Sequence, residues 1–137
     1  MDAAALAKLA ITRGAILHGC FDGIDHSKFF VIIGENDNHL VGFFFINSQI
    51  HQSIKEKQAQ FEMQMQIRKS DYDFLSHDSF VGADQIKVIN KNKIASDISE
   101  GKTQIKGSLT DVDLSMLLDA LRDSKLFSKV EKDTFFK

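Results

Sequence analysis

The sequence predicts a mainly β domain with one α-helix near its C-terminus. Two runs rich in β-branched and aromatic residues, 28–34 and 40–46, flank a polar turn at 35–38, a pattern typical of a β-hairpin. From residue 111 onward the apolar residues recur every three or four positions, which is typical of a helix. A chain of 137 residues has the length of a single domain.

The first part of the chain is predicted to be a short extension followed by a strand. Residues 1–12 are apolar in part but lack the basic segment of a signal peptide, so we interpret them as an N-terminal extension. Residues 15–21 are apolar and precede turn-forming residues at 22–25, which predicts a strand and then a loop. No apolar run approaches the roughly 20 residues that span a bilayer, so we expect a cytoplasmic protein without a membrane partner.

The two hairpin runs are apolar at nearly every position, which indicates that both of their faces are covered. Such strands occur where a sheet curls into a small barrel, or where a helix or a second subunit packs on its outside. Residues 48–60 are polar and predict a loop with at most one helical turn. In 61–67, Phe and Met residues alternate with polar ones, which predicts a half-buried strand.

The second half of the chain predicts a short strand and the C-terminal helical region, 110–137. Residues 79–81 form the strand, which continues after Gly82 toward 86–89, and 90–92 are expected to turn. Thr110 is the expected N-cap of the leucine-rich helix, with Asp113 completing a weak capping box. Ser128 and Glu131 repeat this capping pattern, and Phe135 and Phe136 are expected to dock on the body or on a partner.

Composition excludes several classes of protein and site. The net charge of -2 gives no global positive field for nucleic acid, although a basic stretch at 87–106 could form a solvated face or a phosphate-tracking edge. The single cysteine, Cys20, excludes a disulfide framework and is predicted to fill the core. His18 and Cys20 share a strand face, but zinc needs at least three protein ligands, so we expect no metal and no cofactor.

Further polar residues admit a catalytic interpretation beside a structural one. Asp22, Asp25 and His26 share one loop but lack the spacing of a calcium loop. Ser48 and Ser79, with His51 and His77, would suit a hydrolase, yet the sequence has no G-x-S-x-G elbow. Turn formation is therefore the simpler interpretation of these loop residues.

Six short segments carry a resemblance to a known family. They are 13–17 (RGAIL), 28–33 (KFFVII), 45–48 (FINS), 74–81 (FLSHDSFV), 86–94 (IKVINKNKI) and 107–110 (GSLT). In this order they resemble the PemK/MazF-type growth inhibitors, the toxins of toxin–antitoxin modules, over about residues 13–122. The resemblance implies that 1–137 is a single small SH3-like barrel with a C-terminal helix, usually a homodimer, that cuts single-stranded RNA.

The resemblance also implies a set of site residues. Cleavage of this kind activates a ribose 2′-hydroxyl against the adjacent phosphate, which requires a base, an acid and a cation. Lys28 matches the position where the family's arginine enters the second strand, and Arg68 and Asp71 match positions where some members have an acid and a base, so these three are the implied catalytic residues. Asn47 and Ser48, at the end of the third strand, are the implied RNA-binding residues.

The expected partners are a second copy, an antitoxin protein and single-stranded RNA. A homodimer is also expected because twelve phenylalanines exceed what one small barrel easily encloses. The alternative is a non-enzymatic protein-interaction module, in which Phe43–Phe45 and Phe135–Phe136 form a surface that pairs with a second copy or another protein.

Overall fold

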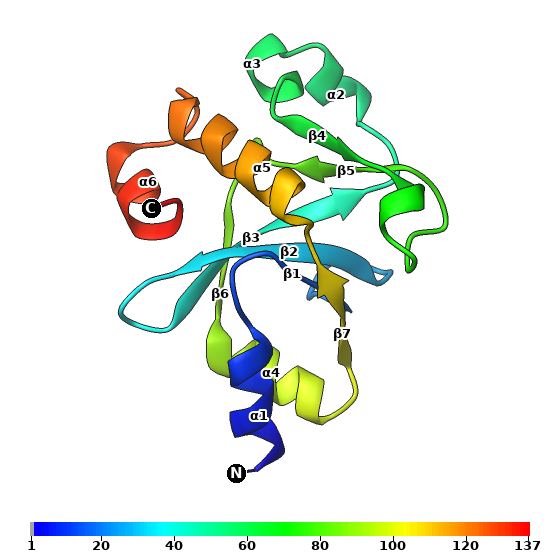
Figure 1. Cartoon of the computed structure of the whole chain (residues 1–137), viewed down its shortest axis with the longest axis vertical. Coiled ribbons are helices and arrows are strands. Elements are labelled where there is room, and N and C mark those ends of the chain that lie inside the picture. Colours follow the sequence, from blue (N-terminus) through cyan, green and yellow to red (C-terminus); the bar gives the residue numbers. More distant parts are fainter. Residues whose placement is uncertain (1) are drawn as a thin grey trace.

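Helices cover both faces of an open antiparallel sheet in the computed structural model, which describes residues 2–137 (Figure 1). The strands are β1 (Ala15–Gly19), β2 (Lys28–Glu35), β3 (Leu40–Asn47), β4 (Gln64–Ile67), β5 (Ser79–Gly82), β6 (Lys87–Asn90) and β7 (Thr103–Ser108). Their order is β4-β5-β3-β2-β1-β7, and β6 pairs with the first half of β3. No pairing within residues 2–137 joins β4 to β7, so the sheet is open rather than the closed barrel that the resemblance implies.

The β2–β3 hairpin is confirmed, and helices explain why its strands are apolar on both faces. One face contributes Val31 and Phe44 to a core shared with Leu117 and Leu121 of α5 (Asp111–Asp123). The other face packs against α1 (Ala3–Ala10) and α4 (Lys91–Ser99), which lie together below the hairpin in Figure 1. Side chains alternate between these two cores along each strand, as the strand period requires.

Helices hold more of the chain than the sequence predicts, with 35% of residues against 29% in strands. Asp2 caps α1 by accepting from the backbone nitrogen of Ala5 at 2.7 Å, so the predicted extension 1–12 contains a packed helix. Asn90 caps α4 by accepting from the nitrogen of Asn92 at 2.8 Å. The turn predicted at 90–92 is therefore wrong, because asparagine favours helix N-caps as well as turns.

The predicted strand at 61–67 is only half correct. Residues 48–61 contain two short helices, α2 (Gln52–Lys55) and α3 (Gln58–Phe61), and β4 begins at Gln64. Met63 and Ile67 are buried as the alternation predicts, whereas Phe61 ends α3 and is 43% exposed. The strand β7, which pairs with β1, has no counterpart in the prediction.

The C-terminal region is largely as predicted. Thr110 caps α5, accepting from the nitrogen of Asp113 at 3.1 Å, but the Asp113 carboxylate accepts from the Tyr72 hydroxyl and does not complete a capping box. The box of Ser128 with Glu131 is complete at the start of α6 (Lys129–Phe135).

The phenylalanines are mostly inside the molecule. Among residues 2–137, Phe61 alone of the twelve is classed as exposed. Phe43, Phe44 and Phe135–Phe136 are buried, so the phenylalanine surface expected of the alternative module is wrong. The abundance of phenylalanine consequently gives no reason to expect a second copy. None of the helices within residues 2–137 has both the length and the apolar character needed to cross a bilayer.

Candidate functional site

A cavity of about 600 Å³ lies at the open end of the hairpin, which we define as the start of β2 and the end of β3. Four of the chain's five histidines line it, namely His18, His26, His51 and His77. Lys28, Asn47 and Ser48, three of the residues predicted from the sequence, line it as well. We refer to it as the first cavity.

Lys28 is held in place by two neighbours at this end of the sheet. The Phe29–Ile46 pair sets the register of β2 and β3, which brings Lys28 opposite Asn47. The Lys28 Nζ donates a hydrogen bond of 2.5 Å to Asn47 Oδ1 and lies 4.9 Å from the centroid of the Phe45 ring. Partial burial lowers the pKa of the Lys28 ammonium. The cation is therefore fixed and partly desolvated at the wall of the cavity.

His18 occupies the adjacent strand. It pairs in register with Phe29 across β1 and β2, and the two ring centroids are 4.3 Å apart. Burial, and then the positive charge of Lys106, lower the pKa of His18. Its imidazole is consequently neutral near pH 7 and can accept a proton.

The other three histidines are oriented by local contacts. His51 caps α2, and its Nδ1 accepts from the backbone nitrogen of Ser53 at 3.1 Å, so the neutral ring carries its proton on Nε2. The Nδ1 of His77 lies 3.0 Å from Ser76 Oγ, and that of His26 lies 3.0 Å from Asp25 Oδ1. No group of three or more His, Cys, Asp or Glu side chains within residues 2–137 is arranged to hold a metal ion.

Arg68 and Asp71 are not among the residues that line the first cavity. Both are exposed, and Arg68 precedes the 3₁₀ turn η1 (Lys69–Asp71) after β4, of which Asp71 is the last residue. The nitrogen of Lys69 donates to Asp78 Oδ1 at 2.8 Å, which ties this turn to the residue preceding β5. The structure thus brings Lys28, Asn47 and Ser48 together, and the catalytic roles of Arg68 and Asp71 stay predictions.

Cys20 does not fill the core, so this prediction is wrong. The strand β1 ends at Gly19, and Cys20 is exposed with its Sγ 3.4 Å from Ser27 Oγ. The reason is that the chain leaves the sheet after Gly19, two residues before the end of the apolar run 15–21.

A second cavity, of about 620 Å³, adjoins the first and shares Asn47, Gln49 and His51 with it. Gln64 and Asp84 line this second cavity. Gln64 Nε2 donates to Asp84 Oδ1 at 2.9 Å and to the carbonyl oxygen of Gln60 at 3.2 Å. Sequence reasoning missed both residues, and the only signal was that Gln64 occupies a polar position of the 61–67 alternation.

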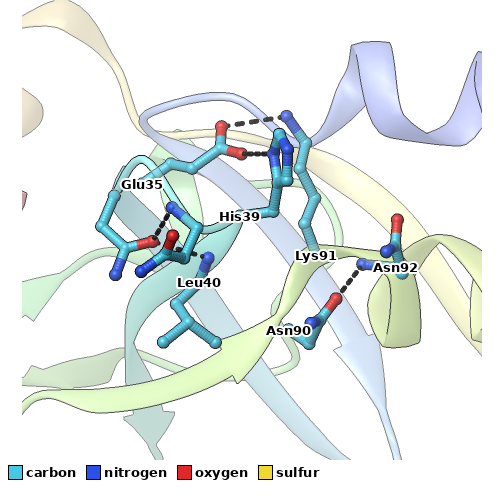
Figure 2. A network of polar contacts seen from close by, with 8 residues as sticks. Glu35, His39, Leu40, Asn90, Lys91 and Asn92 are labelled. Atoms are coloured by element: carbon cyan, nitrogen blue, oxygen red, sulfur yellow. Dashed lines mark hydrogen bonds and ion pairs between the residues drawn. The ribbon is translucent and has the colours of Figure 1, made fainter.

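The polar residues at the hairpin tip, where β2 turns into β3, contact one another (Figure 2). Glu35 accepts from Lys91 Nζ at 3.1 Å and lies 3.4 Å from His39 Nδ1. Asn36 Oδ1 accepts from the backbone nitrogens of Asn38 and Leu40, each at 2.9 Å. The ion pair of Glu35 with Lys91 joins the tip to the start of α4, and the Asn36 contacts hold the turn itself. Glu35, His39 and Lys91 also line a cavity of about 420 Å³.

Comparison with known proteins does not add to this description. No protein-family model matches the sequence, and no curated protein is significantly similar to it. The functional argument therefore depends on the residues of the two cavities.

Proposed function

We propose that this chain is a PemK/MazF-like growth-inhibitor homologue that cleaves single-stranded RNA in the first cavity by attack of a ribose 2′-hydroxyl. The observation that carries the proposal is the shared position of Lys28 and four histidines around one cavity. RNA cleavage without a metal needs a base, an acid and a fixed cation close together, and imidazole and ammonium groups supply all three.

Each of these tasks is assigned to a residue that lines the first cavity. Neutral His18 takes the proton of the 2′-hydroxyl, whose oxygen then attacks the adjacent phosphorus. Lys28 stabilises the negative charge that develops on the phosphoryl oxygens. His26 or His77 acts as the acid that donates a proton to the leaving 5′-oxygen, so the products are a 2′,3′-cyclic phosphate and a free 5′-hydroxyl. Substitution of His26 and His77 in turn identifies the acid.

Binding is expected to be weak and sensitive to salt. Few cations line the two cavities, Lys28 in the first and Lys55 in the second, and the net charge of -2 repels the strand. Asn47 and Ser48 line the same cavity and offer neutral hydrogen-bonding groups beside Lys28, and their proposed role is to bind the RNA.

The experiment compares Lys28→Met and His18→Gln with the wild type on a fluorogenic single-stranded RNA at low salt. We expect each substitution to lower the cleavage rate by about 10²–10³-fold, while Lys8→Met in α1, remote from the cavity, leaves it unchanged. The same oligonucleotide lacking its 2′-hydroxyls should bind without being cut. A wild-type protein that does not cut RNA, or a rate that ignores Lys28 and His18, would overturn the proposal.

One observation favours the alternative of a non-enzymatic interaction module, although at a different surface from the one predicted. An apolar groove of about 250 Å³ between β4 and α5 is lined by Met63, Met65, Met116, Leu117 and Ala120, among others. Met116 is 58% exposed, and β4 is an end strand of the sheet. Methionine surfaces adapt to varied partners, and end strands can pair with another chain. Protein without any RNA binding or cleavage would favour this second function.

A further inference from the structure

The second cavity has a different chemical character from the first. Four of its nine lining residues carry carboxamide side chains, namely Asn47, Gln49, Gln52 and Gln64. A carboxamide both donates and accepts hydrogen bonds without carrying charge, which suits the edge of a nucleobase better than a phosphate. The charged residues of the lining are Lys55 and Asp84.

The two cavities adjoin and share Asn47, Gln49 and His51. We refer to them together as the track. Asn47 receives the hydrogen bond of Lys28 and also lines the second cavity. Gly82 separates Asn47 from Gln64, and a Cβ atom placed there would lie 3.1 Å from Asn47 Nδ2 and 3.5 Å from Gln64 Oε1. The missing side chain lets the two amides approach the same backbone position. A strand whose scissile phosphate lies at Lys28 therefore continues into the second cavity.

Asp84 has unused hydrogen-bonding capacity in this track. Gln64 is fixed by two acceptors, Asp84 Oδ1 and the Gln60 carbonyl, and so orients the Asp84 carboxylate. Within residues 2–137 no side-chain hydrogen bond reaches Asp84 Oδ2, and Oδ1 keeps a second lone pair. A carboxylate with both oxygens available accepts two parallel N–H bonds.

From these observations we infer that the second cavity is a guanine-reading subsite beside the cleavage site, with Asp84 accepting from N1–H and the N2 amino group. Guanine presents two adjacent donors on its Watson–Crick edge, whereas adenine, cytosine and uracil present one donor group each. Lys55 supplies a charge for the flanking phosphate. This inference rests on the proposed function, since it assigns a base to the same RNA strand.

The test measures binding separately from cleavage. The probes are fluorescein-labelled thymidine octamers with one central guanine, hypoxanthine, adenine or cytosine, which lack 2′-hydroxyls and cannot be cut by the proposed route. For the wild type at low salt, we expect the guanine probe to bind about tenfold more tightly than the adenine or cytosine probe. Hypoxanthine, which lacks the N2 amino group, should be intermediate.

Two variants identify the residue responsible. Asp84→Asn should reduce the guanine preference to less than about threefold, because the amide offers one acceptor in place of two. Asp37→Asn, at the exposed hairpin tip, removes the same charge and should keep the full preference. Comparing preference ratios cancels the gain in overall affinity that both variants obtain from the less negative charge. The hypoxanthine result needs no variant and so holds even if Asp84→Asn fails to fold.

The outcomes separate this inference from the proposed function. A wild type that binds the four probes equally, or an Asp84→Asn variant that keeps the preference, overturns the subsite while RNA cleavage can still stand. A guanine preference that depends on Asp84, without cleavage of RNA, supports the subsite and overturns the proposed reaction. Absence of binding to every probe overturns the subsite, and the RNA cleavage assay then decides the proposed reaction separately.

Discussion

The two ends of the β2–β3 hairpin use polar side chains in opposite ways. At the tip, Glu35, His39 and Lys91 satisfy one another and fasten the hairpin to α4 (Figure 2). At the open end, Lys28 and Asn47 contact each other but border a cavity of about 600 Å³. The tip residues also line a cavity, of about 420 Å³, but the charges of Glu35 and Lys91 are paired there, whereas Lys28 has a neutral hydrogen-bond partner. We therefore interpret the tip contacts as structural and the open end as the place of the proposed site.

The C-terminal helix α6 packs closely against the strands near the tip. A Cβ atom on Gly34 would overlap the carbonyl oxygen of Phe135, and one on Gly42 would lie 2.8 Å from Phe135 Cδ1. Arg13 donates to the carbonyl oxygens of Ile33 and Phe135, at 2.7 and 3.1 Å. Here the backbones of β2 and α6 touch, which the open end does not permit.

The largest expected effect is a difference in the free energy of unfolding between variants near the tip and variants at the open end. Phe136 is fully buried and its ring centroid lies 5.0 Å from that of Phe127, so Phe136→Ala should lower the free energy of unfolding by about 3–5 kcal/mol. Lys28→Met, at the open end, should change it by less than about 1 kcal/mol. Urea denaturation measures both values. Equal losses of unfolding free energy for the two variants would contradict the different roles assigned to the two ends.

Two glycine substitutions test the same difference between the tip and the open end. Gly34→Ala should cost about 1–3 kcal/mol, because the backbone of Phe135 must move away. Gly82→Ala, at the open end, meets the flexible amide of Asn47 at 3.1 Å and should cost less than about 1 kcal/mol. The measurement is again the urea midpoint of each variant, and a greater loss for Gly82→Ala would contradict the assignment of roles.

The smallest expected effect concerns pH. Burial, and then the charge of Lys106, lower the pKa of His18 in the folded protein, so the unfolded chain binds the proton more readily. Stability should therefore fall as the pH drops below about 6.5, the unperturbed histidine value. His18→Gln should fall less steeply than the wild type when unfolding is followed between about pH 7.5 and 5.5. Identical slopes for His18→Gln and the wild type would refute the prediction.

The elements that sequence patterns predict well are those whose signals are local and redundant. The hairpin has two long apolar runs around a polar turn, and α5 has both a cap at Thr110 and a leucine stripe. By contrast, α4 has few apolar residues, and its cap Asn90 also suits a turn. The end strand β7 is mostly exposed, so it carries no alternation to detect.

The site was only partly predictable for a related reason. Lys28, Asn47 and Ser48 are implied by the resemblance, which matches them to the ends of strands that the sequence indicates. The gathering of His18, His51 and His77 depends on which strands are neighbours and on loops that cross the sheet end. Strand order is a long-range property, and a single sequence does not report it.

The burial of Phe136 against Phe44 also affects when the core can form during synthesis of the chain. Roughly ninety residues separate the two rings along the chain, and synthesis proceeds at about 5–20 residues per second. For about 5–20 seconds after the ribosome adds Phe44, Phe136 has not yet been synthesised and the core on this face of the hairpin is incomplete. During that interval the apolar strands of the nascent chain are open to chaperones and to aggregation.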